Sequence, residues 1–154
     1  MRVAGHFNYS QIPEIVYQTF TDRDALLYST PGLRTLDQIT PDEYDATLKI
    51  GVGGFELVYR GRLALTDRIP NQQYRFRVDA STHNGYGRGE AVFRFLPGPT
   101  GGTRVEYDAD VELGGGQKLY PSIARGLVDF FLRGMGHWMQ ELDAGRVPWP
   151  PATS

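Results

Sequence analysis

Six consecutive segments between residues 33 and 113 alternate apolar and polar side chains, and this run leaves few ways for the chain to fold. The run begins with LRTLDQIT and ends with GTRVEYDADVEL, and Gly, Pro, Asn or Asp residues typical of turns separate its segments. Residues 2–9, RVAGHFNY, show the same alternation. Because consecutive strands joined by short turns pair with one another, we expect a seven-stranded antiparallel sheet.

Three further segments have the spacing of helices. Residues 10–22 place Pro13 in a first helical turn and Ile15, Val16 and Phe20 on one side, and RDALLYST is a second short helix that ends before Pro31-Gly32. A long helix is expected from about residue 118 to 143, with a broad apolar arc. The arc consists of Tyr120, Ala124, Leu127, Val128, Phe131, Met135, Trp138, Met139 and Leu142.

An apolar sheet face must be buried, and the long helix is the only large element available to cover it. We therefore expect an α+β fold in which a curved seven-stranded antiparallel sheet wraps around a long C-terminal helix, with two short helices after the first strand. The length of 154 residues and the 40% hydrophobic content suit one domain over 1–144, followed by a Pro-rich tail over 145–154.

The charge and residue counts argue against several kinds of function. Sixteen basic and 18 acidic residues give a net charge of −2, which provides no general attraction for nucleic acid. The absence of cysteine excludes disulfides and thiolate chemistry. No stretch approaches the roughly 18 apolar residues of a membrane span, so we expect a cytoplasmic protein.

Strand parity also divides the expected sheet into an inner apolar face and an outer charged face. The inner sets are Tyr44/Ala46/Leu48/Ile50, Phe55/Leu57/Tyr59/Gly61/Leu63/Leu65, Tyr74/Phe76/Val78/Ala80, Gly89/Ala91/Phe93/Phe95 and Val105/Tyr107/Ala109/Val111. Several of these residues are small, which either leaves an apolar cavity or lets the helix and sheet approach closely. Both interpretations stay open. The helix glycines Gly126, Gly134 and Gly136 likewise require a packing or functional reason, such as a close contact or a hinge.

The outer face and the histidines show no reaction chemistry. Arginines lie on the outward parity of three neighbouring strands and carboxylates on a later one, which indicates either cross-strand ion pairs or a docking surface for a protein or anionic lipids. We expect His6, His83 and His137 to be surface or hydrogen-bonded structural residues, because their spacing does not suit a metal site. Residues 85–89, GYGRG, lead into a strand and are expected to form a turn, not a phosphate loop.

The run TPGLRTLDQITPDEYDATLKIGVGGFELVYRGRLALTDRIPNQQYRFRV, followed by GRGEAVFRF and GGTRVEYDADVELGG, resembles the CoxG family, which is named for a subunit of carbon monoxide dehydrogenase. The resemblance covers roughly residues 1 to 143 and lies mainly in Pro31-Gly32, KIGVGGF, RGRLALTD and RGEA. It implies the helix-grip fold of the START-like (SRPBCC) superfamily. It also implies a non-catalytic protein without a cofactor that binds a lipid or quinone and is accessory to a molybdenum CO dehydrogenase or related hydroxylase, in peripheral contact with the inner membrane face.

The expected ligand-binding residues combine the inner sheet face with the helix arc. They are Tyr44, Leu48, Phe55, Leu57, Tyr59, Gly61, Phe76, Gly89, Ala91, Phe93, Tyr107, Phe131, Gly134, Met135 and Trp138. No catalytic residue or metal ligand is expected, because the inner sets contain no Asp, Glu, Lys, Arg or His. The alternative is a small START-like enzyme of the polyketide aromatase/cyclase type that uses cavity tyrosines, and an acid or a histidine in the cavity would favour it.

Overall fold

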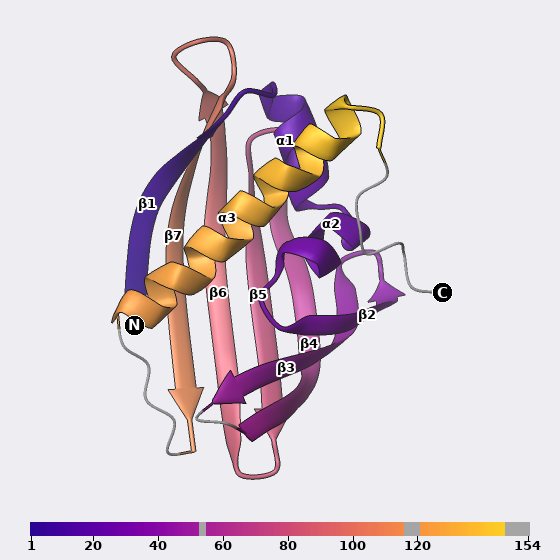
Figure 1. Cartoon of the computed structure of the whole chain (residues 1–154), viewed down its shortest axis with the longest axis vertical. Coiled ribbons are helices and arrows are strands. Elements are labelled where there is room, and N and C mark those ends of the chain that lie inside the picture. The colour runs from indigo at the N-terminus through magenta and orange to yellow at the C-terminus, as the bar shows by residue number, and fades with distance from the viewer. Residues whose placement is uncertain (53–54, 116–120, 147–154) are drawn as a thin grey trace.

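The computed structural model describes residues 1–52, 55–115 and 121–146, and these form one antiparallel sheet with three helices. Its seven strands follow the order β1-β7-β6-β5-β4-β3-β2, so the first strand pairs with the last (Figure 1). The strands are β1 (Arg2–Tyr9), β2 (Leu33–Thr40), β3 (Glu43–Val52), β4 (Phe55–Ile69), β5 (Gln73–Thr82), β6 (Gly85–Pro97) and β7 (Thr103–Gly114). The predicted α+β helix-grip fold is confirmed.

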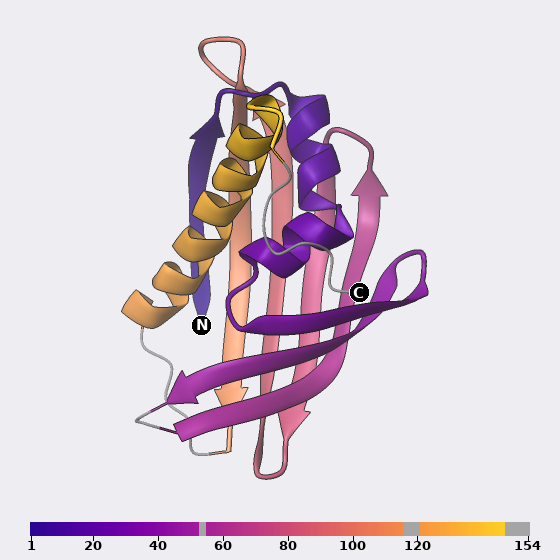
Figure 2. The ribbon, with the colours of Figure 1, turned by 45° about the vertical axis from the view of Figure 1, so that its right-hand side comes forward.

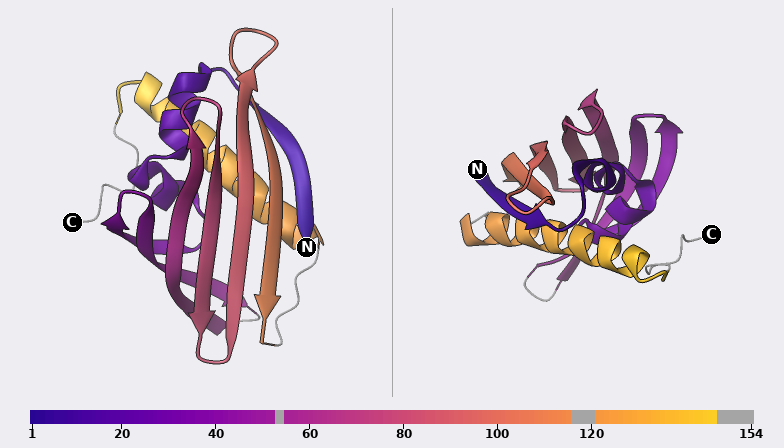
Figure 3. Two further views of the ribbon diagram at one scale, coloured as in Figure 1. Left: turned by 180° about the vertical axis from the view of Figure 1, so that it is seen from behind. Right: turned by 90° about the horizontal axis from the view of Figure 1, so that it is seen from above.

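The helices are α1 (Pro13–Phe20), α2 (Arg23–Ser29) and α3 (Pro121–Asp143). The long helix α3 crosses the concave face of the sheet diagonally, and α1 and α2 lie beside its C-terminal half (Figures 1 and 2). Seen from above, the sheet curves around the helices, and from behind its outer face is uncovered (Figure 3). The other half of α3 therefore faces the sheet without a helix beside it.

Local signals set the ends of these helices. Pro13 begins α1, and the Asp22 carboxylate caps α2 by accepting a hydrogen bond of 2.9 Å from the Ala25 N–H. Gly145, at a φ of +75°, ends α3, because its left-handed conformation suits glycine. The predicted start of the long helix at residue 118, together with Tyr120, lies outside the described residues, as do residues 147–154 of the expected tail.

The core is a cluster of aromatic rings between the sheet and the helices. Phe20 of α1 is fully buried, and its ring meets those of Phe93 and Phe131 edge-on at centroid distances of 5.3 and 5.6 Å. The Tyr9 hydroxyl of β1 donates a hydrogen bond of 2.6 Å to the Leu132 carbonyl of α3. Burial strongly raises the pKa of Tyr9, so this phenol stays neutral and keeps its donor proton.

Four positions differ from the predicted helix faces, and one of them is Leu127 of the predicted arc, which is 38% exposed. Ile15 is 39% exposed, because α1 turns Val16 and Phe20 inward and leaves Ile15 beside them in solvent. Leu142 is 50% exposed because it belongs to the last turn of α3. Leu132, which the predicted arc leaves out, is only 1% exposed, and its carbonyl accepts the hydrogen bond from Tyr9 of β1. The buried face of α3 therefore includes a position that the amphipathic pattern leaves out.

Candidate functional site

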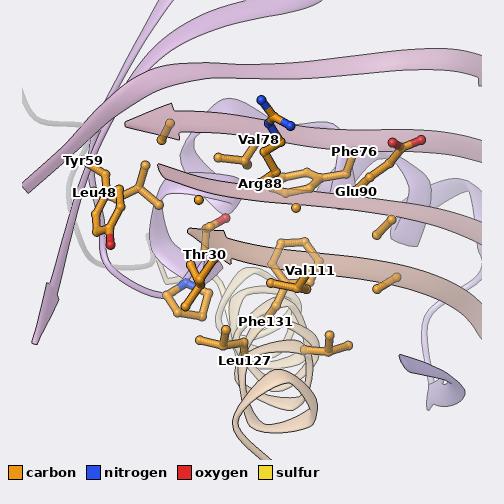
Figure 4. A pocket seen from close by; sticks show the side chains of 18 of the residues that line it. Thr30, Leu48, Tyr59, Phe76, Val78, Arg88, Glu90, Val111, Leu127 and Phe131 are labelled. Atoms are coloured by element: carbon orange, nitrogen blue, oxygen red, sulfur yellow. The ribbon is translucent and has the colours of Figure 1, made fainter. Parts of the chain in front are cut away.

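An apolar cavity of about 190 Å³ lies between the concave face of the sheet and the N-terminal half of α3 (Figure 4). Ile50 of β3 and Leu127 of α3 are 36% and 38% exposed, and they mark where the cavity opens to solvent. The described lining consists of Thr30, Pro31, Leu48, Ile50, Tyr59, Phe76, Val78, Ala80, Gly87, Arg88, Gly89, Glu90, Ala91, Phe93, Tyr107, Ala109, Val111, Leu113, Leu127, Val128 and Phe131.

Small residues at alternate positions of β6 create this space. Gly87, Gly89 and Ala91 point to the same face, and Ala80 of β5 and Ala109 of β7 pair with two of them. A Cβ added at Gly89 would have no atom within 4 Å, which shows that open volume faces this position. The cavity therefore follows from three neighbouring strands that all carry small side chains on their inner face.

The structure brings together eight of the residues expected to bind ligand. They are Leu48, Tyr59, Phe76, Gly89, Ala91, Phe93, Tyr107 and Phe131, and all of them line the cavity. Six others lie outside this lining: Tyr44, Leu57, Gly61, Gly134, Met135 and Trp138. Phe55 begins β4, but its side chain lies outside the described residues. Ligand contact at each of these positions stays a prediction.

Gly61 and Gly134 serve close packing, which is one of the explanations that the sequence leaves open for these small residues. A Cβ at Gly61 would overlap the Asp79 carbonyl oxygen and lie 2.6 Å from the Ala80 Cα, because β4 and β5 approach each other there. A Cβ at Gly134 would lie 3.0 Å from Ser29 of α2. Each glycine thus admits a neighbouring backbone where a side chain would collide with it.

The expected set misses other parts of the lining. Thr30 and Pro31 come from the connection between α2 and β2, which has no periodicity that could have revealed their position. Val111 belongs to the predicted inner face but was left out of the ligand set, and extending the inward parity of β6 by two residues from Gly89 would have found Gly87. The cavity therefore draws on a loop as well as on the sheet and the helix.

The polar side chains that face this cavity are uncharged. Arg88 and Glu90 belong to the lining, but Figure 4 shows their side chains turned away from α3. Arg88 pairs with Asp79 at 3.2 Å, and the hydrogen bond from Arg75 lowers the pKa of Glu90 more than partial burial raises it. The described lining contains no Asp or His. No acid or histidine side chain of the kind that would favour the aromatase/cyclase alternative thus points into the described cavity.

Hydroxyl groups supply the remaining polarity. Tyr59, Tyr107 and Thr30 line the cavity. Burial raises the pKa of Tyr107, with a further increase from Asp129 and an opposing effect of Arg125, so its phenol is neutral near pH 7. The Thr30 hydroxyl is buried and has no hydrogen-bond partner among the described residues. The chemistry offered to a bound molecule is therefore apolar contact and neutral hydrogen bonding.

The outer sheet face carries the expected cross-strand ion pairs. Arg62 pairs with Asp45 at 3.1 Å and Arg94 with Asp108 at 3.5 Å, and these side chains are largely exposed. Exposed pairs of this kind contribute about 0–1 kcal/mol each. His137, which was expected to be a surface or hydrogen-bonded residue, shares a short hydrogen bond with the Tyr28 hydroxyl. In the described part of the chain no group of three or more His, Asp or Glu residues is arranged to hold a metal ion.

A curved antiparallel sheet that grips a long C-terminal helix above an apolar cavity defines a protein of the START-like, helix-grip class. The structure is similar to a conserved protein from Geobacillus kaustophilus, with 23% identity, a TM-score of 0.82 and coverage of 92% of this chain and 96% of that chain. It is also similar to a START superfamily protein from Mycobacterium smegmatis, with 14% identity, a TM-score of 0.68 and coverage of 92% and 98%. Such low identities show a shared fold alone.

Comparison of the sequence with models of protein families identifies the family of this chain. The model of the CoxG family, described as a subunit of carbon monoxide dehydrogenase, matches residues 5–135, and the chain belongs to this family. Among curated proteins, none matches the chain by sequence. Within the described residues, no helix has the length and apolar character needed to cross a membrane.

Proposed function

We propose that this protein is a non-catalytic carrier that binds an apolar small molecule, a lipid or a quinone, in the cavity beneath α3. The observation that carries the proposal is the cavity of about 190 Å³, whose wall is almost wholly apolar and whose open volume faces Gly89. Protein interiors are normally close-packed, so unfilled apolar volume costs stability that a bound molecule can restore. Apolar cavities of about 150 Å³ stay dry and accept small hydrophobic molecules.

The proposed partner is a molybdenum CO dehydrogenase-type enzyme, and membership of the CoxG family supports it. In this role the protein would carry its ligand between the enzyme and the membrane. The exposed surface of α3 supports a peripheral membrane contact, because Ile123, Leu127 and Phe130 recur at helical spacing and are 48%, 38% and 54% exposed. Leu127 also belongs to the cavity wall, so this surface adjoins the opening.

Binding of an apolar probe tests the carrier proposal directly. Titration of the protein with ethylnaphthalene should show saturable binding, and native mass spectrometry of the purified protein should detect a copurifying lipid or quinone. Gly89→Leu should abolish probe binding while the protein stays folded, because the new side chain would occupy the open volume. If the wild-type protein binds no probe and carries no apolar molecule, the carrier proposal is wrong.

Vesicle cosedimentation tests the membrane contact separately. Phe130→Gln removes the most exposed apolar side chain of the α3 surface and should lower the fraction of protein bound to liposomes of phosphatidylethanolamine and phosphatidylglycerol. Ile39→Gln is the matched control, because Ile39 is 45% exposed on β2, away from α3 (Figure 1). Equal losses in both variants, or no loss in either, would contradict a contact through α3.

A further inference from the structure

Thr30 places a buried and unsatisfied hydroxyl in the wall of the apolar cavity. Its Oγ1 atom is shielded from solvent and has no hydrogen-bond partner among the described residues. Figure 4 shows Thr30 in the middle of the lining, between the sheet residues Leu48 and Val78 and the helix residue Leu127. Buried polar groups in proteins nearly always have a partner, so an unpaired one beside open volume indicates where a ligand group belongs.

Backbone hydrogen bonds hold this residue in place. Thr30 follows the last turn of α2, and its N–H donates to the Leu26 carbonyl at 2.9 Å. Its carbonyl accepts a hydrogen bond of 3.2 Å from the Leu33 N–H, and Pro31 follows directly. Because hydrogen bonds hold the main chain on both sides of Thr30, a ligand can bind the Thr30 hydroxyl without first fixing the conformation of this segment.

The surroundings of the hydroxyl disfavour a charged ligand group. The lining side chains near Thr30 are apolar, and Arg88 and Glu90 turn away from the cavity toward partners on the outer face. A carboxylate in this cavity would lose its hydration without gaining a counter-charge. A neutral carbonyl oxygen loses far less hydration, and it can accept the proton that the Thr30 hydroxyl has free to donate.

We propose that Thr30 anchors one neutral carbonyl group of an otherwise apolar ligand by donating a hydrogen bond from its hydroxyl. This inference rests on the proposed function, since it takes the cavity beneath α3 as the ligand site. It narrows the ligand group that binds at Thr30 to the neutral carbonyl of a largely apolar compound and disfavours a carboxylate at that position.

Three naphthalenes substituted at the same ring position test the anchor. Acetylnaphthalene carries the neutral carbonyl, ethylnaphthalene has a similar shape without an acceptor, and naphthoate carries a carboxylate. Calorimetric titrations compare the wild-type protein with Thr30→Val, which removes the hydroxyl at nearly constant shape, and with Thr30→Ser, which retains it. Thermal unfolding of each variant verifies that it is folded.

Thr30→Val should weaken acetylnaphthalene binding by about three- to tenfold, the range expected for one neutral hydrogen bond. The same variant should leave ethylnaphthalene binding unchanged or tighter, and Thr30→Ser should retain most of the affinity for acetylnaphthalene. Naphthoate should bind more weakly than either neutral probe to the wild-type protein.

The outcomes separate this inference from the function on which it rests. If both neutral probes bind and Thr30→Val changes their affinities equally or not at all, Thr30 is not an anchor, while the cavity remains a binding site. Naphthoate binding as tightly as acetylnaphthalene would also overturn the inference alone. If no probe binds to the wild-type protein, the proposed function fails and the inference fails with it.

Discussion

The two halves of α3 use one amphipathic pattern for different purposes. Residues 131–139 bury Leu132, Met135 and Met139 almost completely. Residues 123–130 leave Ile123 and Phe130 about half exposed. The C-terminal half packs against α1, α2 and β1, whereas the N-terminal half lies over a cavity. One end of the helix therefore holds the fold together, and the other end is free to shape a binding site.

The helix glycines follow the same division. In the packed half, a Cβ at Gly134 would lie 3.0 Å from Ser29, and one at Gly136 would lie 3.3 Å from the Tyr9 ring. In the open half, a Cβ at Gly126 would have no atom within 4 Å. Close approach of neighbouring residues to α3 therefore explains Gly134 and Gly136 in the packed half. It does not explain Gly126 in the open half.

Hydrogen bonds reinforce the packed half. The Tyr9 hydroxyl reaches the Leu132 carbonyl, and the Tyr28 hydroxyl bonds to His137 while their rings stack at a centroid distance of 5.8 Å. The rings of Tyr28 and Trp138 also meet at 5.4 Å, so α2 is held to α3 at several points. This arrangement fixes the segment that carries Thr30 into the cavity wall.

The largest expected effect on stability comes from shortening one apolar side chain in each half of α3. Trp138→Ala should lower the free energy of unfolding by about 3–5 kcal/mol, because it removes a large side chain that is only 7% exposed. Leu127→Ala, in the open half, should cost about 1 kcal/mol, because this side chain is already 38% exposed. Chemical denaturation measures both values, and equal costs would show that the two halves are packed alike.

A second contrast compares two glycines on the inner sheet face. Gly61→Ala should destabilise the protein by about 1–3 kcal/mol, because the new methyl group would overlap the backbone of β5. Gly89→Ala should be neutral or slightly stabilising, because its methyl group would enter open volume. Thermal and chemical unfolding compare the two variants. A comparable loss at Gly89 would mean that the volume facing it is filled.

A smaller effect distinguishes the glycines within α3. Gly126→Ala should stabilise the protein by about 0.5–1 kcal/mol, because alanine favours the helix and meets no neighbour there. Gly134→Ala should gain clearly less, because its methyl group would press on Ser29. Denaturation curves of the two variants give the comparison, and equal gains at both positions would remove the proposed role of Gly134 in helix packing.

Most of the fold could be predicted from the sequence, because alternation and turn residues are local signals. Strand parity also placed Phe76, Gly89 and Tyr107 on the inner face, where they line the cavity. Parity could not show that Gly61 meets the backbone of β5, since that depends on how closely two strands approach. Thr30 was missed because it belongs to a connection, and its place in the wall results from the docking of α2 on α3.

Gly89→Leu shows whether the open half of α3 covers a ligand cavity. An apolar side chain that enters empty volume adds contacts without overpacking, so the free energy of unfolding should stay within about 1 kcal/mol of the wild-type value. Calorimetric titration with ethylnaphthalene should then show binding to the wild-type protein and none to the variant. A variant that unfolds more easily by about 1–3 kcal/mol, as expected of an overpacked core, or one that still binds the probe with about wild-type affinity, would contradict the account.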